Sequence, residues 1–397
     1  MHILMIAPEP FFEPRGTPFS EFHRIRALTT LGHTVDLVTY PFGRDVEMPG
    51  LRIFRCLRPP FVHRVRIGPS WAKVPLDMAL AVTALRRALG GKYDAVHSHE
   101  EGGAIGVVLS RLLGIPHLYD MHSSLPQQVE NFGVRHGKLL ARMLGWVERL
   151  MIGQSKVVIV ICQDLEDTVR AGYPDVPTVL IENASGAGPA LGAGPAVKRE
   201  LGLSADTPVV LYTGTFEAYQ GLDLLYDAMA RVVRSRPDAR LVMVGGEPGQ
   251  VEAARQQVSA RGLAGVVVFT GQRPPDDVPK YLDAASALVS PRSGGTNTPL
   301  KIYQYLRSGR PIVATRLRTH TQVLDDDSAV LVEPTAEAFA DGILRVLTDP
   351  ALAARVGARA IEVAAEKYSD EAFIEKTRRA FRLLADDGPA ATVGDAA

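Results

Sequence analysis

A Gly-rich turn with two flanking cations is the stretch most suited to chemistry. The sequence predicts a strand at 287–291, a Gly-rich turn at 293–298 and a helix at 299–308, with Arg292 before the turn and Lys301 in the first helical turn. Such a turn directs backbone N–H groups and the positive end of the helix dipole at one point, which suits a phosphate. The alternative is an ordinary strand–turn–helix unit without a ligand.

The ends of this helix carry recognisable signals. Thr298 is predicted to cap the helix, and Pro299 to occupy its first turn, where a missing N–H costs nothing. Gly309 is expected to end the helix.

Three histidines form a second candidate group. His122 follows a predicted buried strand (117–121) at its carboxyl end, where open α/β sheets bind ligands. His97 and His99 are two residues apart on another strand, so they point to the same side. Without a third ligand in view, a metal site is not expected, and His99 is predicted to line a cleft. The run Asp325–Asp327 is expected to form a solvated turn without a metal.

Strands and helices alternate along the chain in two series. The strands are near-continuous apolar runs, such as ILMIA and VVIVI, which is typical of parallel sheets covered on both faces. A Gly/Ala/Pro-rich segment, residues 184–196, separates the two series and predicts a linker. Its glycines resemble a dinucleotide-binding turn, but Pro189 and Pro195 interrupt any helix there. A weak alternative, an NAD oxidoreductase, rests on this segment alone.

The predicted fold class is therefore α/β, with two facing, doubly wound, Rossmann-like domains. The first domain is predicted at 1–183 and the second at 184–369. A helix at 370–386 is long enough to cross back to the first domain, and 387–397 is expected to be a disordered tail.

Charge and composition exclude several classes of protein. Lys plus Arg and Asp plus Glu number 44 each, so no nucleic-acid partner is expected. The two cysteines, Cys56 and Cys162, lack metal-ligand spacing and are predicted to be buried thiols in a reducing compartment. The first residues do not read as a signal peptide, and no apolar run is long enough to span a membrane. These features predict a cytoplasmic protein.

Residues 51–73 form a local basic and aromatic stretch without an acid. It suits contact with an anionic membrane surface, at the inner face of the membrane, or a lipid-phosphate acceptor. The alternative is that its cations pair with acids elsewhere in the fold. The stretch contains Arg52, Phe54, Arg55, Arg58, Phe61, Arg64, Arg66, Trp71 and Lys73.

In this order and spacing, the segments resemble the retaining glycosyltransferases of family four, which have the GT-B fold. The resemblance covers nearly the whole chain and rests on the opening strand and Gly loop, DAVHSHEEGG, GIPHLYDMHSS, IEN, VVLYTGTFEAYQGLDLLYDAM and the stretch around 287–316. It implies a nucleotide-sugar-binding second domain and an acceptor-binding first domain. No cofactor and no metal are implied, since the nucleotide sugar is a co-substrate.

The resemblance also assigns roles to individual residues. It implies that His122 hydrogen-bonds the transferred sugar, and that the base of the donor lies near Gly271–Arg273. Donor-binding positions are implied or hypothesised at Gly16, Thr17, Gly214, Thr215, Gln220, Arg292, Asn297, Thr298, Lys301 and Gln304. His99 and Glu217 are the remaining candidates for the acceptor or the cleft, although Glu217 is equally consistent with an exposed loop acid.

Several positions depart from the family pattern. Thr296 and Gln304 replace the paired glutamates of the donor motif, and Thr215 and Gln220 replace the Arg and Lys that bind the diphosphate. Ala184 replaces a glycine. We hypothesise that Arg292 and Lys301 supply the missing cations and that the amide of Gln304 hydrogen-bonds a ribose hydroxyl.

The function implied is transfer of a sugar, from a UDP- or GDP-sugar, to a cell-envelope glycolipid or polysaccharide, with retention and without a metal. The neutral replacements keep a second possibility open, a non-catalytic protein that binds nucleotide sugars or lipids. A nucleotide-sugar epimerase shares the architecture, but the sequence assigns it no acid and base residues.

Overall fold

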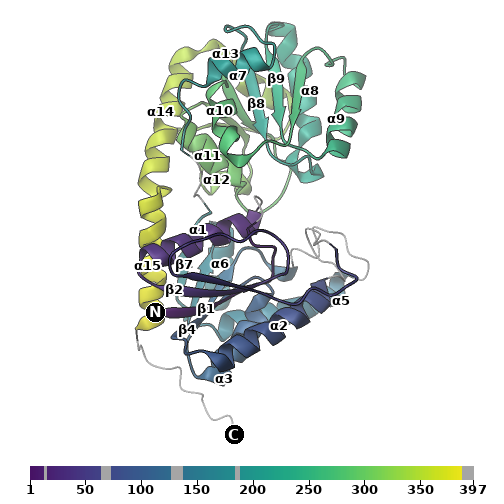
Figure 1. Cartoon of the computed structure of the whole chain (residues 1–397). Helices are drawn as coiled ribbons and strands as arrows, with labels where there is room; N and C mark the ends of the chain where they lie inside the picture. The colour runs from purple at the N-terminus through teal and green to yellow at the C-terminus, as the bar shows by residue number, and fades with distance from the viewer. Residues whose placement is uncertain (13–15, 64–72, 127–136, 184–187, 387–397) are drawn as a thin grey trace. The chain divides into compact units, whose positions relative to one another are not determined.

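The chain folds into two α/β units, each built on one parallel sheet (Figure 1). The computed structural model describes residues 1–397 except 13–15, 64–72, 127–136, 184–187 and 387–397. The first unit runs to Asn183 and resumes at Asp370, and the second runs from Ala184 to Ser369.

The sheet of the first unit has seven parallel strands in the order β3-β2-β1-β4-β5-β6-β7. The strands are β1 (His2–Ala7), β2 (Thr34–Thr39), β3 (Leu51–Arg55), β4 (Ala95–His99), β5 (His117–Met121), β6 (Val157–Val160) and β7 (Thr178–Leu180). The helices are α1 (Gly16–Thr30), α2 (Lys73–Gly90), α3 (Gly102–Leu113), α5 (Gly137–Gly153), α6 (Gln163–Gly172) and α15 (Asp370–Ala385).

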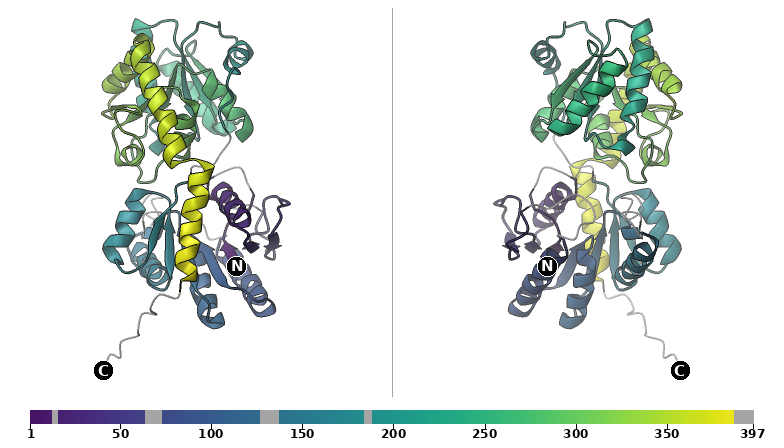
Figure 2. Two further views of the ribbon diagram at one scale, coloured as in Figure 1. Left: turned by 90° about the vertical axis from the view of Figure 1, so that its left-hand side faces the viewer. Right: turned by 90° about the vertical axis from the view of Figure 1, so that its right-hand side faces the viewer.

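Alternate residues of the strands serve two cores, one on each face of this sheet. Ile3 and Met5 of β1 pack with α1 and α15, whereas Leu4 and Ile6 pack with α2 and α3. Along the same face as α2 and α3, Met121 packs with α5 and α6. Figure 2 shows α15, in yellow, lying along this sheet. The expected return of the last helix to the first domain is confirmed.

The sheet of the second unit has six parallel strands in the order β10-β9-β8-β11-β12-β13. The strands are β8 (Val209–Thr213), β9 (Arg240–Val244), β10 (Val267–Gly271), β11 (Ala287–Ser290), β12 (Ile312–Thr315) and β13 (Val330–Val332). The α-helices are α7 (Gly194–Glu200), α8 (Leu222–Ser235), α9 (Pro248–Ala260), α10 (Val278–Asp283), α11 (Leu300–Ser308), α12 (Arg318–Thr321), α13 (Ala336–Thr348) and α14 (Pro350–Lys367). Two short 3-10 helices are η1 (Ala218–Gln220) and η2 (Pro275–Asp277).

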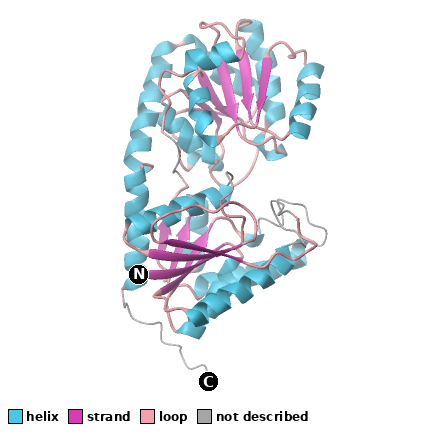
Figure 3. Cartoon of the chain, viewed as in Figure 1, coloured by secondary structure: helices cyan, strands magenta, loops and turns pink. Residues whose placement is uncertain are grey.

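Helices cover both faces of each sheet, as Figure 3 shows by colour. Because both faces are buried, most strand positions are apolar, although β4 (AVHSH) and β5 (HLYDM) also bury polar side chains. The prediction of two doubly wound, Rossmann-like domains is confirmed. Among the described residues, Cys56 and Cys162 are buried thiols outside any disulfide, as predicted, and each lies just beyond the end of a strand.

Two local predictions were wrong. The helix expected from Pro299 begins at Leu300, and Pro299 itself is the N-cap, in an extended conformation with φ −64° and ψ 131°. Thr298 is therefore not the cap. The proline retains its preferred φ in both conformations, so only its ψ decides where the helix starts. The linker predicted to extend to residue 196 also ends earlier, since α7 starts at Gly194 and accommodates Pro195 in its first turn.

Candidate functional site

The order of strands marks one position in each sheet where ligands bind in this class of fold. The direction of winding reverses between β1 and β4 in the first unit, and between β8 and β11 in the second. Loops that leave the carboxyl ends of the two strands separate there and leave a crevice. Some of the candidate residues lie in the loops at these two positions, among them Arg292 after β11 and Gln220 after β8.

In the second unit, Lys301 is buried beneath the loop that follows β8. Its Nζ lies 3.8 Å from the centre of the Tyr212 ring and 3.2 Å from Oε1 of Gln220. Burial lowers the pKa of Lys301 well below its ordinary value, and the charge of Arg292 lowers this pKa further. The amine is thus held by a ring face and a neutral amide.

Arg292 follows β11 and lies beside this lysine. Its guanidinium lies over Tyr219, 5.1 Å from the ring centre, and donates to the carbonyl of Asn297 at 2.8 Å and to Oγ1 of Thr319 at 2.9 Å. Burial lowers the pKa of Arg292 from its usual value. Both cations are therefore placed by aromatic and neutral polar groups.

Among the described residues, neither Lys301 nor Arg292 forms an ion pair with a carboxylate. Buried charges without a counter-charge are costly, and two neighbouring cations repel each other as well. An anion that enters this site would therefore be stabilised by both. The arrangement suits an anion such as a diphosphate.

Two glycines with positive φ shape the loop that follows β8, and one of them, Gly221, lets this loop approach the loop after β11. Gly214 has φ 136°, and a Cβ there would lie 3.5 Å from Nζ of Lys301. Gly221 has φ 71°, and a Cβ there would lie 2.0 Å from the carbonyl oxygen of Pro291, a distance no side chain tolerates. The loop after β8 can thus lie against the loop after β11 only with glycine at position 221.

The other donor-binding candidates of this unit are only partly brought together. Asn297 offers its carbonyl to Arg292, and Gln220 contacts Lys301. Thr298 is buried and its hydroxyl has no hydrogen-bond partner among the described residues. Gln304 instead lines a small hollow together with Leu191.

Three further predicted positions in this unit lie in exposed loops. Thr215 is exposed and accepts a hydrogen bond from Tyr212 through its carbonyl, and Glu217 accepts one from Gln250. Arg273, in the region predicted for the base, forms an ion pair with Glu200 at 3.5 Å. Asp325–Asp327 is exposed in a turn, as expected.

In the first unit, a buried carboxylate organises the histidines. Asp120 of β5 pairs with the Nε of Arg24 at 3.0 Å, with Nε2 of His97 at 3.4 Å and with Nε2 of His122 at 3.3 Å. Burial alone would raise the pKa of Asp120, but Arg24 and then His122 hold this pKa well below its usual range. Asp120 therefore keeps its negative charge and orients His122.

His99 supports the same histidine. Its Nδ1 lies 3.2 Å from Nε2 of His122, and its ring stacks on His97 at 4.7 Å. Both His97 and His99 are fully buried, and burial lowers the pKa of each. The two rings are therefore neutral at physiological pH and support the ring of His122 from below.

Two sets of buried donor atoms have the composition of a metal site: His97, His99 and Asp120, and Glu9, Glu21 and His99. In the first set, Arg24 already neutralises Asp120. In the second, burial raises the pKa of Glu21 well above its usual value, and the charge of Glu9 raises it further. A proton on Glu21 removes the excess charge without a metal ion.

Sequence reasoning missed several residues of these two groups. An acid within the buried strand HLYDM was the available signal for Asp120, and the sequence offered no equivalent signal for Arg24 or Tyr212. Glu100, at the end of β4, was also missed. It has a positive φ of 45°, accepts hydrogen bonds from Ser123, and burial raises its pKa to about 8. Backbone strain of this kind is concentrated at functional sites.

Gly16 and Thr17 are the first residues of α1, but their surroundings lie outside the described residues. Arg64, Arg66 and Trp71 of the basic stretch themselves lie outside the described residues.

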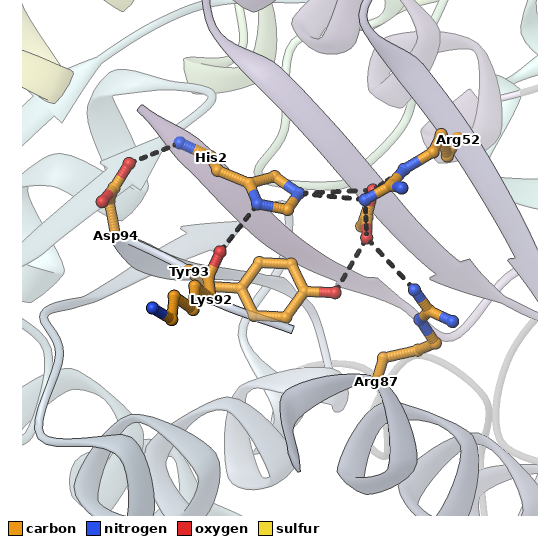
Figure 4. A network of polar contacts seen from close by, with 7 residues as sticks. His2, Arg52, Arg87, Lys92, Tyr93 and Asp94 are labelled. Atoms are coloured by element: carbon orange, nitrogen blue, oxygen red, sulfur yellow. Dashed lines mark hydrogen bonds and ion pairs between the residues drawn. The ribbon is translucent and has the colours of Figure 1, made fainter. Parts of the chain in front are cut away.

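Most of the described cations in the basic stretch are paired with acids. Arg52 pairs with Asp36 at 2.7 Å, in the network of Figure 4. Arg55 pairs with Asp45 at 2.8 Å, and Lys73 with Glu101 at 2.9 Å. These three cations match the alternative of pairing within the fold. Among the helices that the structure describes, none has the length and apolar composition required to cross a bilayer.

Comparisons with known proteins agree with this architecture. Residues 23–184 match the glycosyl transferase 4-like domain, and residues 207–349 match the glycosyl transferases group 1 model. The chain is 27% identical over 361 residues to the D-inositol 3-phosphate glycosyltransferase of Acidothermus cellulolyticus, covering 83% of this chain and 77% of that one.

Solved structures share the fold over almost the whole length. Sucrose-phosphate synthase of Thermosynechococcus elongatus has a TM-score of 0.77 at 23% identity, covering 96% of this chain and 98% of that one. HepE of Anabaena, solved in complex with UDP, has a TM-score of 0.73 at 17% identity, covering 96% of this chain and 100% of that one. With two family models matched in order and a GT-B fold, the chain belongs to the group 1 glycosyltransferases of family four, retaining enzymes that use a nucleotide sugar as donor.

Proposed function

We propose that the second unit binds the diphosphate of a UDP- or GDP-sugar through Arg292 and Lys301, and that the sugar is transferred to a cell-envelope glycolipid or polysaccharide. The observation that carries the proposal is a buried pair of cations without an acidic partner among the described residues. The donor supplies the missing negative charge, and binding it raises the pKa of Lys301 again.

The contact between Lys301 and Gln220 supports this assignment. Gln220 and Thr215 occupy the positions where the family pattern has its two diphosphate-binding cations. Since Nζ of Lys301 lies 3.2 Å from the Gln220 amide, the positive charge that the loop lacks is restored at nearly the same place from α11. Gly214, Asn297 and Thr298 would line the diphosphate as well.

For the base and the ribose of the donor, fewer contacts in the structure support the proposed positions. The base is proposed near Gly271–Arg273, and UDP is the first nucleotide to test because HepE was solved with it. Gln304 is proposed to hydrogen-bond the ribose. Gly16 and Thr17 are proposed as donor-binding residues from the family resemblance alone.

In the first unit, His122 is proposed to hydrogen-bond the transferred sugar. Asp120 and His99 fix its Nε2, so the ring is already oriented when the substrate binds. As the sugar becomes oxocarbenium-like, Arg292 and Lys301 stabilise the charge that develops on the leaving diphosphate. The leaving phosphate takes the proton of the acceptor, so no enzyme nucleophile and no metal are needed.

Two classes of acceptor can be compared, large envelope glycoconjugates and small molecules. An envelope glycolipid or polysaccharide would place the protein at the inner face of the membrane. The name of the Acidothermus relative adds inositol phosphate as a small acceptor. Both belong in the same assay.

The test is release of nucleoside diphosphate from a panel of UDP- and GDP-sugars, with membrane extract, with inositol phosphate and without acceptor. Release that requires one donor and increases with an acceptor would identify both substrates. In parallel, Lys301→Met is expected to weaken UDP or GDP binding by roughly 10- to 100-fold in calorimetry, because it removes a charged hydrogen-bond donor.

Lys280→Met is the matched control, since this lysine is exposed and pairs with Asp277 at 2.7 Å. Equal loss of affinity in both variants, or none in Lys301→Met, contradicts the assignment of the diphosphate site. Tight donor binding without release under any acceptor would instead favour the non-catalytic binding protein.

A further inference from the structure

The outer face of α2 is apolar, which is unusual for a surface helix. Its inner face carries Leu76, Leu80, Ala84 and Ala88 against the sheet. The outer face should then be polar. Instead, its exposed side chains are Val74, Met78, Val82, Leu85, Arg86 and Leu89, of which Arg86 alone is charged.

The two neighbouring helices continue this pattern. On α3, Val108 is 64% exposed and Leu112 is 57% exposed. On the described part of α5, Met143, Trp146 and Leu150 are exposed, Trp146 to 60%. Single exposed apolar residues are ordinary, but a run across three helices marks an interaction surface.

These side chains point to the same side of the first unit. The helices α2, α3 and α5 are neighbours in contact, and all three cover the same face of the sheet (Figure 1). Residues that point away from the sheet on each helix therefore form one band, which we call the apolar band: Val74, Met78, Val82, Leu85, Leu89, Val108, Leu112, Met143, Trp146 and Leu150.

On the three helices that carry the apolar band, the exposed charged side chains that the structure describes are all positive. Among the described side chains of α2, α3 and α5, the exposed charged residues are Arg86, Arg111, Arg142 and Arg149.

The two acids of these helices are withdrawn from the surface. Glu148 is buried and accepts a hydrogen bond from the backbone N–H of Leu125 at 2.6 Å, and Asp77 accepts one from the hydroxyl of Tyr40. Exposed apolar and basic side chains without an exposed acid are the composition that binds anionic lipid surfaces.

We propose that the apolar band docks the first unit onto an anionic membrane surface, with the three helices parallel to it. Charge decides between this occupant and a second copy of the chain. In a symmetric dimer the arginines would face the same arginines, whereas anionic headgroups complement them. Trp146 is suited to the boundary between headgroups and acyl chains.

This surface is distinct from the basic stretch 51–73, whose Arg52, Arg55 and Lys73 are paired with acids. The inference goes beyond the proposed function and does not depend on transfer. Vesicle binding requires neither donor nor acceptor, so failure of one proposal is distinguishable from failure of the other.

The experiment is co-sedimentation of the full chain with vesicles of phosphatidylcholine, alone or mixed with phosphatidylglycerol. The wild type is expected to bind the mixed vesicles, and less so at high salt. Met78→Gln/Trp146→Gln and Arg86→Glu/Arg149→Glu are each expected to reduce the partition coefficient by about tenfold or more. These residues are exposed, so circular dichroism and the melting temperature should stay unchanged.

Leu191→Gln/Ile361→Gln is the matched control, because both side chains are exposed and apolar but belong to the second unit. It is expected to bind as the wild type does. Equal binding by the wild type and both band variants would overturn the proposal. The proposal would also be overturned if the wild type bound no vesicles and sedimentation velocity showed it to be a dimer while both band variants were monomers. The apolar band would then be the interface with a second copy of the chain.

Discussion

At the scale of single residues, burial separates the groups that keep a charge from those that lose it. Asp120 remains ionised because Arg24 accompanies it into the interior. Lys301 has no acid beside it among the described residues, so burial acts on its pKa unopposed. Glu21 is fully buried, and neither of its oxygens has a hydrogen-bond partner among the described residues. The pH dependence of stability should reveal that Glu21 is held in its neutral form.

We expect Glu21→Gln to change how stability varies with pH. The pKa of Glu21 is raised in the folded state, so the folded protein binds the proton more tightly than the unfolded chain. The wild type therefore loses stability as the pH rises above the unfolded value of about 4.5, by up to about 1.4 kcal/mol per pH unit. The glutamine variant lacks this loss.

Urea unfolding at a series of pH values from about 4 to about 8 would measure the difference. This range starts near the pKa of a glutamate in the unfolded chain and extends well above it. The exposed Glu252→Gln is the control and should differ from the wild type by a constant amount. A difference between Glu21→Gln and the wild type that does not grow with pH would show that Glu21 is not held neutral.

At the scale of elements, the loops at the carboxyl ends of β8 and β11 define the diphosphate site. They are held together by a backbone hydrogen bond from Ser293 to the carbonyl of Tyr219 at 3.2 Å, next to Gly221. The position of Arg292 over Tyr219 depends on this contact. The close approach explains why a glycine is needed there.

We expect Gly221→Ala to displace the loop after β11 and to weaken nucleotide binding. Gly202 is the matched control, since it has nearly the same φ (69° against 71°) but open space around it. Gly202→Ala should cost about 1 kcal/mol for the left-handed backbone, whereas Gly221→Ala should cost roughly 3 kcal/mol or more.

Unfolding in urea gives the two costs, and calorimetry with UDP and GDP gives the affinity. Gly202→Ala should leave nucleotide affinity unchanged. Similar costs for both variants would mean that the loops after β8 and β11 can separate without a loss of stability.

At the scale of the whole molecule, the first unit is discontinuous in sequence. Its last helix, α15, is separated from the rest of the unit by the whole second unit. Phe373, Phe381 and Leu384 of α15 are buried in the core with Ile25, and Thr377 accepts a hydrogen bond from Arg24 at 3.1 Å. The end of the chain therefore completes a core that its beginning starts.

We expect a chain ending at Ser369 to lose the fold of the first unit. Each large apolar side chain removed from a core costs roughly 1.5–3 kcal/mol, and a domain has about 5–15 kcal/mol in total. Hydrogen exchange should show unprotected amides in β1–β7 and protected amides in β8–β13. Phe381→Ala, a milder change, should destabilise the first unit by about 3–5 kcal/mol. Full protection of β1–β7 in the shortened chain would contradict this account.

Sequence pattern alone predicted most of the architecture. Apolar runs, helical periodicity and turn residues gave two parallel-sheet units and a returning last helix, because strands buried on both faces are mostly apolar. The start of α11 was misplaced by one residue, since the sequence fixes the φ of Pro299 but not its ψ. Pattern also marked Arg292 and His122, which follow strand ends, and Lys301, which lies in the first turn of α11.

Only the tertiary structure decided which side chains meet. Lys301 and Gln220 are 81 residues apart and Arg24 and Asp120 are 96 apart, and their contacts depend on strand order and helix packing. The apolar band is a property of three helices packed on one face of a sheet, and the sequence of each helix by itself does not tell which of its apolar side chains stay uncovered. The sequence determined what each element is, because that depends on local periodicity and burial. The fold decided which charges lack a partner and which apolar faces remain uncovered, because both depend on neighbours that are distant along the chain.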